Sequence, residues 1–463
     1  MKVTGTGIVS PLGRTPSEIA TRILSAAPEE ARPASNPPPH LCPLPLEGGE
    51  GRVRGKIAVA EFGAPSFRLG PFNAEDFVSI DPDRFRILDR PTSFAFVAAR
   101  DAYDAAGLNR LPPDRIGISC GIGYATTGVN AAFFSDALDL GPRMVSPLLF
   151  PLTTPSAVAG ALSIFLPAAG PTLTVSAGSA SDLSSLARAA EMLEEGDADA
   201  VVAGAAGDAD ETLARALGTA GLLSGRTPLP FHPMADGTAL GEGAAFVVLE
   251  SAGTDSALED KTRSLQNAGA GGRGRGAPSL GTADAVRTMG LSEDRTRSLH
   301  SAGPSAREET NALPAYLVGI GESFEHESLA GARTIARAIE DALAQSGLNP
   351  EEIDGILAGT GIRATDAAEA EAVRRVFKDR VPVISLRGIM GESFGSTNLM
   401  SALIVLECGR RGFWPASLPG PRAREALVPL TAQPTPTRGR TLLVVATSAS
   451  GHAAAALFTN GMG

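Results

Sequence analysis

"TVSAGSASDLSSLARAAEMLEEG", residues 174–196, is the stretch that narrows the fold most. An apolar run ends at Val175, a turn of very small residues follows, and a helix-period segment then runs to Gly196, a residue typical of helix C-termini. Small residues at a strand-to-helix turn can expose a nucleophile. Ser179 lies in that turn, so the sequence raises the question of whether Ser179 is a nucleophile or marks the place of a lost one.

The pattern of this stretch recurs along the chain. Apolar, β-branched runs bounded by glycine alternate with helix-period segments, which predicts an α/β protein with layered sheets and helices. Residues 99–123 and 338–361 share one order: a helix, a Gly-Leu stop and a strand. We therefore predict an internal duplication whose second half begins near Leu313.

Two stretches do not fit this pattern. Residues 31–55 are rich in Pro, Gly and charge, and residues 251–312 have no sustained period, so both are predicted to be flexible insertions and most simply passive surface loops. The predicted domains are accordingly an N-terminal half at 1–250 and a C-terminal half at 313–463.

Composition limits the function. The chain has 463 residues, 43% of them hydrophobic, which is enough for a large core. Its net charge of −11 disfavours binding to nucleic acid or to acidic membranes. Five histidines and three cysteines without metal-ligand spacing predict neither a metal site nor a cofactor, and the sparse cysteines favour a reducing, cytoplasmic location.

No signal peptide is expected, because the N-terminus lacks a long apolar run. Residues 145–181 contain no charged side chain, but five prolines interrupt them. That segment is predicted to be buried or at an interface rather than inserted in a membrane.

Seven stretches, in order, resemble the β-ketoacyl synthases of the thiolase-like superfamily. They cover the family's opening strand, nucleophile elbow, following strand, Gly-Glu-Gly element, two catalytic loops and terminal loop. In this chain they are residues 3–13, 170–181, 196–208, 226–250, 359–377, 381–397 and 448–458.

The resemblance implies a five-layered αβαβα fold of two duplicated halves, a dimer, and a site at the junction of the halves. It also implies a mechanism in which an elbow Cys takes an acyl chain from an acyl carrier protein, and two His and a Lys promote decarboxylative condensation. Matched by motif, the Cys position holds Ser179, the first His position Ala358, the Lys position Arg387 and the second His position Glu392. Residues that shape the site keep the family pattern in two loops: Gly359, Thr360, Asp366 and Glu369. The terminal loop, with Ser450 and Gly451, lacks the family's Phe.

These replacements weaken the chemistry. A serine needs an adjacent base, and Ala358 offers no side-chain donor or acceptor. An ionised Glu392 would repel an oxyanion, so we predict that it pairs instead with Arg387. The five histidines, His40, His232, His300, His326 and His452, are expected to have surface or core roles.

Three functions remain open, beside a chain with a purely structural role. The first is a non-condensing homologue that resembles the chain-length-factor subunits of fatty-acid or polyketide synthesis. It would act with acyl carrier protein, as a heterodimer with a ketosynthase or as a homodimer. The second is a Ser179-dependent acyltransferase or hydrolase that acts on acyl-carrier-protein thioesters. The third is a divergent but active 3-oxoacyl synthase.

Overall fold

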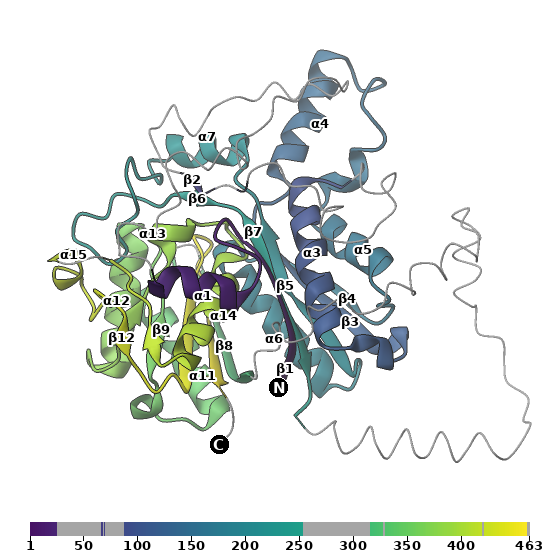
Figure 1. Ribbon diagram of the computed structural model, residues 1–463. Coiled ribbons are helices and arrows are strands. Elements are labelled where there is room, and N and C mark those ends of the chain that lie inside the picture. The colour runs from purple at the N-terminus through teal and green to yellow at the C-terminus, as the bar shows by residue number, and fades with distance from the viewer. Residues whose placement is uncertain are drawn as a thin grey trace, which may run out of the picture. The chain divides into compact units, whose positions relative to one another are not determined.

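The computed structural model describes residues 1–25, 66–67, 69, 88–252, 315–326, 329–418 and 421–460 (Figure 1). The predicted insertion at 31–55, residues 253–312 of the second insertion, and the domain boundary near 312 lie outside the described residues, and the domain limits stay a prediction. The strands are β1 Lys2–Val9, β2 Ser66–Phe67, β3 Ile116–Ile122, β4 Thr172–Val175, β5 Ala200–Gly207, β6 Leu240–Gly241, β7 Gly243–Glu250, β8 Ala315–Phe324, β9 Gly355–Leu357, β10 Val383–Ile384, β11 Phe413–Trp414, β12 Thr435–Pro436, β13 Thr441–Thr447 and β14 His452–Asn460.

The helices come between and after these strands. The α-helices are α1 Pro16–Ser25, α3 Arg90–Ala105, α4 Thr127–Asp139, α5 Ser156–Phe165, α6 Ser181–Glu194, α7 Glu211–Thr219, α11 Ala332–Ser346, α12 Arg363–Phe377, α13 Arg387–Met390, α14 Thr397–Arg410 and α15 Pro421–Arg424. The short 3₁₀ turns are η4 Leu108–Arg110, η5 Pro113–Arg115, η6 Phe150–Thr153, η7 Gly178–Ala180 and η8 Pro350–Glu352.

The main sheet consists of two equivalent sets of strands. Its order is β10-β9-β13-β14-β8-β1-β7-β5-β3-β4, so each set reads outward from the centre in the same pattern: β1-β7-β5-β3-β4 and β8-β14-β13-β9-β10. The two outermost strand pairs of each set are parallel. In the first set β3 pairs with β4 and β5, and in the second set β9 pairs with β10 and β13. The sets join where Lys2 and Val3 pair with Tyr316 and Ala315. The predicted duplication is confirmed.

Glycine pairs in the first strand of each half allow a helix to pack directly on it. A side chain at Gly7 would place its Cβ 1.9 Å from a backbone oxygen of α3, and one at Gly5 would lie 2.1 Å from another. In the second half, Gly319 and Gly321 meet carbonyl oxygens of α11 at 2.1 and 2.2 Å in the same way. Because only glycine has no Cβ, the same close approach recurs in both halves.

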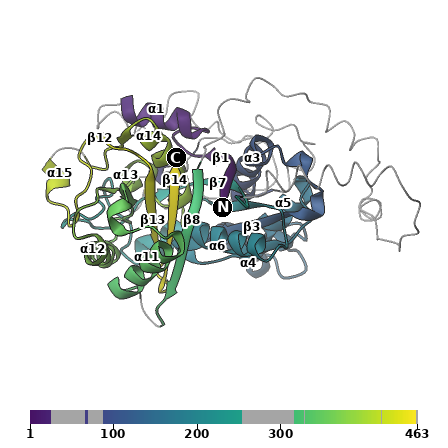
Figure 2. The ribbon, with the colours of Figure 1, turned by 90° about the horizontal axis from the view of Figure 1, so that it is seen from below.

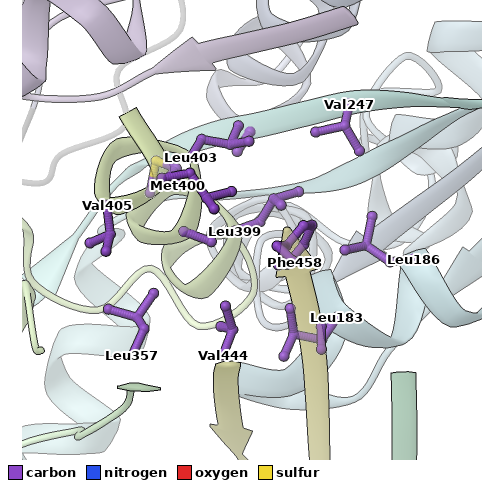
Figure 3. Packing of buried hydrophobic residues seen from close by; sticks show 14 of the residues in the cluster. Leu183, Leu186, Val247, Leu357, Leu399, Met400, Leu403, Val405, Val444 and Phe458 are labelled. Carbon is purple, nitrogen blue, oxygen red and sulfur yellow. The ribbon is translucent and has the colours of Figure 1, made fainter. Parts of the chain in front are cut away.

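The layers follow from this packing. Helices α3 and α5 cover the outer face of the first strand set, and α11 and α12 cover the outer face of the second (Figures 1 and 2). Helices α6 and α14 lie between the two sets, and their Leu183, Leu186, Leu399 and Leu403 share one core with strand residues of both halves (Figure 3). The fold is the expected five-layered α/β arrangement.

Strand β14 is apolar from Ala453 to Phe458, and its packing explains why. Ala454, Ala456 and Phe458 face the central core, whereas Ala455 and Leu457 face the core under α11 and α12. A strand covered on both faces has no solvent side, so its residues do not alternate with polar ones.

The charge-free segment at 145–181 forms η6, α5, β4 and the turn after β4. Of the helices in the part of the chain that the structure describes, none is long and apolar enough to cross a membrane.

Candidate functional site

The turn between β4 and α6 is a tight elbow. Gly178 has a left-handed φ of +57°, which favours glycine. The Ala177 N–H donates to Ser181 Oγ at 2.9 Å, and that hydroxyl donates to the Gly178 carbonyl at 2.7 Å. These bonds place Ser179 directly before a 14-residue helix, whose N-terminus carries partial positive charge.

The Ser179 side chain is only partly buried. Among the described residues, no side chain forms a hydrogen bond with its hydroxyl, so no base is in place to remove its proton. The elbow therefore has the shape that presents a nucleophile but lacks the group that would activate it.

The loop after β9 is fixed by two buried carboxylates. Glu369 accepts the Gly359 N–H at 2.8 Å and also the Thr447 hydroxyl. Asp366 accepts the Thr360 N–H at 2.7 Å and the Phe231 N–H at 2.8 Å. These acids hold the backbone of the loop that carries Gly359 and Thr360, next to Ala358.

Burial changes the acidity of these groups. Burial, together with the nearby Asp366 carboxylate, raises the pKa of Glu369 to about 7. Burial also raises the pKa of Asp182, in the first turn of α6, to about 6, although three hydrogen bonds act against it. Both acids are thus placed to change charge near neutral pH.

The predicted pair of Arg387 and Glu392 is present. Arg387 Nη2 lies 3.0 Å from Glu392 Oε2, and the two side chains are 7% and 3% exposed. The contact is an ion pair without good hydrogen-bond geometry, since Glu392 Oε2 accepts no hydrogen bond. Arg387 Nε also donates to the Gly359 carbonyl at 3.2 Å, so the pair lies against the loop that holds Ala358.

Asn398, in α14, joins this pair to the elbow, and sequence reasoning did not find it. Its Oδ1 accepts from Arg387 Nη2 at 2.6 Å. Its Nδ2 donates to the Ser179 carbonyl at 2.5 Å and to Asp182 Oδ1 at 3.0 Å. The one signal in the sequence is a polar amide in the first turn of an otherwise apolar helix, "TNLMSALIVLECG".

A small pocket lies where these elements meet. Ala358, Ser385, Arg387, Asn398 and Ser401 are among its lining residues, and it has room for about one water molecule. The Ser385 hydroxyl is buried there without a hydrogen-bond partner. A side chain larger than alanine at position 358 would therefore displace one of these groups.

The terminal loop reaches the elbow from the other side. A Cβ added at Gly178 would lie 2.4 Å from Ser448 Oγ, and that hydroxyl lies 3.0 Å from Ser450 Oγ. Gly451 has a left-handed φ of +84° and turns the loop into β14. The structure thus brings together the elbow, the terminal loop and the two loops that follow β9 and β10.

Two of the described histidines pair with glutamates, and no hydrogen bond or ion pair joins a described histidine side chain to Ser179. His232 Nε2 lies 3.2 Å from Glu425, and His452 Nε2 lies 3.2 Å from Glu322. His326 is the third described histidine, and His40 and His300 lie outside the described residues.

The described cysteines do not supply a nucleophile. Burial raises the pKa of Cys120 and of Cys408 to about 12. Among the described residues, no cluster of His, Cys, Asp and Glu could hold a metal ion.

Comparison with known proteins agrees with the fold. Residues 1–254 match the N-terminal domain of β-ketoacyl synthase, and residues 318–420 match its C-terminal domain. The chain belongs to the β-ketoacyl synthase family.

Individual relatives are more distant. The chain is 28% identical over 382 residues to a 3-oxoacyl-[acyl-carrier-protein] synthase 2 of Staphylococcus aureus, which covers 79% of this chain and 82% of that protein. Among solved structures, it is similar to the ishigamide ketosynthase/chain length factor, with a TM-score of 0.72, 20% identity, and coverage of 100% of this chain and 99% of that one. It is also similar to a ketosynthase (ApeO) in complex with its chain length factor (ApeC) from Xenorhabdus doucetiae, with a TM-score of 0.71, 16% identity, and coverage of 99% and 98%.

Proposed function

We propose that this chain is a non-condensing β-ketoacyl synthase homologue that acts as a partner subunit, similar to a chain length factor, in cytoplasmic fatty-acid or polyketide synthesis. The observation that carries the proposal is the buried Arg387–Glu392 ion pair beside Ala358. Condensation needs donors aimed at a developing oxyanion. Here Glu392 already neutralises the charge of Arg387, and the pocket beside Ala358 has room for only about one water molecule.

The expected loss of transition-state stabilisation supports the proposal that this chain does not catalyse condensation. Loss of a single oxyanion donor costs about 3 kcal/mol of transition-state stabilisation. Ala358 has no donor, and Glu392 carries the wrong charge for an oxyanion, so two donors are missing. The expected loss is about 6 kcal/mol, or roughly four orders of magnitude in rate.

An exposed apolar surface supports the partner role. We call the "α4 face" the exposed side chains of Phe134 on α4, Leu138 on α4, Leu148, Phe150 in η6 and Leu173 on β4; they are 38–85% exposed. These side chains lie on neighbouring elements of the fold, and gathered exposed apolar residues mark interaction sites. Strand β4 also ends the sheet, with backbone groups open to a further strand.

Within the α4 face, α4 and η6 pack against each other. The ring of Phe133 contacts both Phe134 and Phe150, and the Asn130 amide donates to the Thr153 carbonyl at 3.1 Å. Some relatives with this fold are described as ketosynthases in complex with a chain length factor or bound to an acyl carrier protein. By analogy, we assign a Cys-containing ketosynthase as the partner on the α4 face and acyl carrier protein as the carrier of the growing chain.

The test is co-expression with candidate ketosynthases, followed by size-exclusion chromatography and product analysis. We expect a heterodimer that makes product only when both chains are present. Leu138→Glu, at an 85% exposed position, should abolish the heterodimer without unfolding the chain. Phe413→Glu, exposed and outside the α4 face, is the matched control and should leave the heterodimer intact.

Two results would contradict the proposal. Decarboxylation of malonyl-acyl-carrier protein by the isolated chain would show that condensing chemistry remains. An acyl adduct on Ser179 that disappears in Ser179→Ala, seen by intact mass, would favour the acyltransferase or hydrolase alternative, whose support is the partly exposed hydroxyl at a helix N-terminus.

A further inference from the structure

Three contacts connect Glu392 to the elbow. Glu392 Oε2 lies 3.0 Å from Arg387 Nη2, and the same nitrogen donates to Asn398 Oδ1 at 2.6 Å. Asn398 Nδ2 then donates to the Ser179 carbonyl at 2.5 Å. A single amide side chain therefore separates a guanidinium from the elbow backbone, and Asn398 is only 4% exposed.

We call the chain of contacts from Glu392 through Arg387 and Asn398 to the elbow the relay. Few charged groups lie around it. The described elements packed there contribute four buried acids and one cation. Asp182 belongs to α6, Asp366 and Glu369 belong to α12, and Glu392 and Arg387 belong to the segment after β10. Arg387 is the only cation in this set, and Glu392 opposes its charge directly. The negative charge of Glu392 therefore opposes the positive charge of Arg387 near the elbow.

Glu392 has a geometric task as well as an electrostatic one. Its Oε1 accepts the Phe394 N–H at 2.6 Å, and Phe394 has a left-handed φ of +50° that is strained for a bulky residue. Glutamine at position 392 could still accept that N–H through its oxygen but would carry no charge. The two tasks are therefore separable by substitution.

We propose that Asn398 is a positioning residue that holds Arg387 against the elbow. Glu392 is the internal counter-ion, and its negative charge offsets the effect of the positive charge of Arg387 at position 179. Removing the charge of Glu392 makes a nucleophile at position 179 more acidic and more reactive. This inference concerns the electrostatics of the elbow and does not depend on the proposed partner function.

The experiment places a thiol at the elbow as a reporter. The full-length chain carries Cys42→Ser and Ser179→Cys, so the other thiols are Cys120 and Cys408, which are buried and have pKa values of about 12. The rate of alkylation by iodoacetamide is measured against pH, and the adduct is located by mass. Circular dichroism and the unfolding midpoint confirm that each variant is folded.

With the relay intact, the reporter thiol should show a pKa set mainly by the helix N-terminus. Glu392→Gln should lower that pKa by about one unit, because Arg387 is no longer neutralised. The thiolate fraction at neutral pH then rises about eightfold. Lower intrinsic nucleophilicity offsets part of this gain, so we expect the rate to rise roughly threefold.

Three further variants separate charge from structure. In the Asn398→Ala background, Glu392→Gln should produce less than half of the pKa shift, because Arg387 is no longer held to the elbow. Arg387→Met should leave the thiol pKa unchanged or raised. Glu407→Gln is the matched control. It neutralises a different buried acid, in α14, that pairs with Arg410 and Arg411, and it should leave the thiol pKa unchanged.

Several outcomes would overturn the proposal. The first is an unchanged thiol pKa in folded Glu392→Gln. The second is an equal shift in the Asn398→Ala background or in Glu407→Gln. The third is a lowered thiol pKa in folded Arg387→Met, because removal of the cation can only leave that pKa unchanged or raise it.

Discussion

The buried Arg387–Glu392 pair gives the sharpest prediction about stability. Arg387→Met removes the cation and leaves Glu392 buried without its counter-ion. It also removes the donors to the Gly359 carbonyl and to Asn398 Oδ1. Breaking a buried ion pair from one side costs about 3–5 kcal/mol, so we expect a loss of about 4 kcal/mol in the free energy of unfolding.

The partner substitution is milder. Glu392→Gln keeps an acceptor for the Phe394 N–H, and Arg387 keeps its bonds to Gly359 and Asn398. We expect a loss of about 2 kcal/mol, mainly the penalty of an unneutralised charge. The double variant Arg387→Met/Glu392→Gln contains no buried charge at this place. It should lose about 3 kcal/mol rather than the sum of about 6 kcal/mol.

The assay is a double-mutant cycle in urea. The single tryptophan of the chain, Trp414, is fully buried, so its fluorescence follows unfolding of the core. Circular dichroism must give the same transition, because the free energies have meaning only for two-state unfolding. Additive losses in the double variant, or a loss under about 1 kcal/mol for Arg387→Met, would refute the reasoning that the pair is a coupled buried unit.

Two other predictions follow from the fold. Glu369 has a pKa of about 7 in the folded chain, against an ordinary value of 4.5, so the folded chain binds this proton more tightly than the unfolded chain does. The protonated Glu369 therefore stabilises the fold. This stabilisation is complete below pH 4.5 and is lost as the pH rises to 7. In urea titrations, the free energy of unfolding should decline by on the order of 3 kcal/mol between pH 4.5 and 7, and Glu369→Gln should remove this decline. An unchanged pH profile in Glu369→Gln would contradict the prediction. Gly321→Ala places a Cβ 2.2 Å from a carbonyl oxygen of α11 and should cost more than about 3 kcal/mol. Gly160→Ala, in α5 with open space around it, should stabilise the chain by up to about 1 kcal/mol, and equal effects at the two glycines would show that close packing is not the cause.

Local features of the site could be predicted from the sequence. Arg387 and Glu392 are five positions apart in one loop, so their pairing needed only a tight turn, and the structure confirms it. The elbow at 174–183 could be proposed because small residues separate an apolar run from a helix-period segment, and because six further motifs stand in the order of the same family.

The relay to the elbow could not be predicted in this way. Asn398 and Ser179 are 219 positions apart, and the Leu399 N–H that reaches Asp182 is 217 positions away from it. No periodicity records such a contact, because it depends on α6 and α14 lying together between the two strand sets.

The sequence by itself determined the duplicated α/β fold, since hydrophobic period, glycine placement and helix ends are local properties that repeat in both halves. It also predicted a turn at 174–183 that contains neither Cys nor His. Only the tertiary structure decided that Glu369 and Asp182 are buried deeply enough to change their acidity, and that the apolar side chains of Leu138 and Phe150 face outward. Burial is a property of the packed layers, because it depends on which segments distant in the chain cover each side chain.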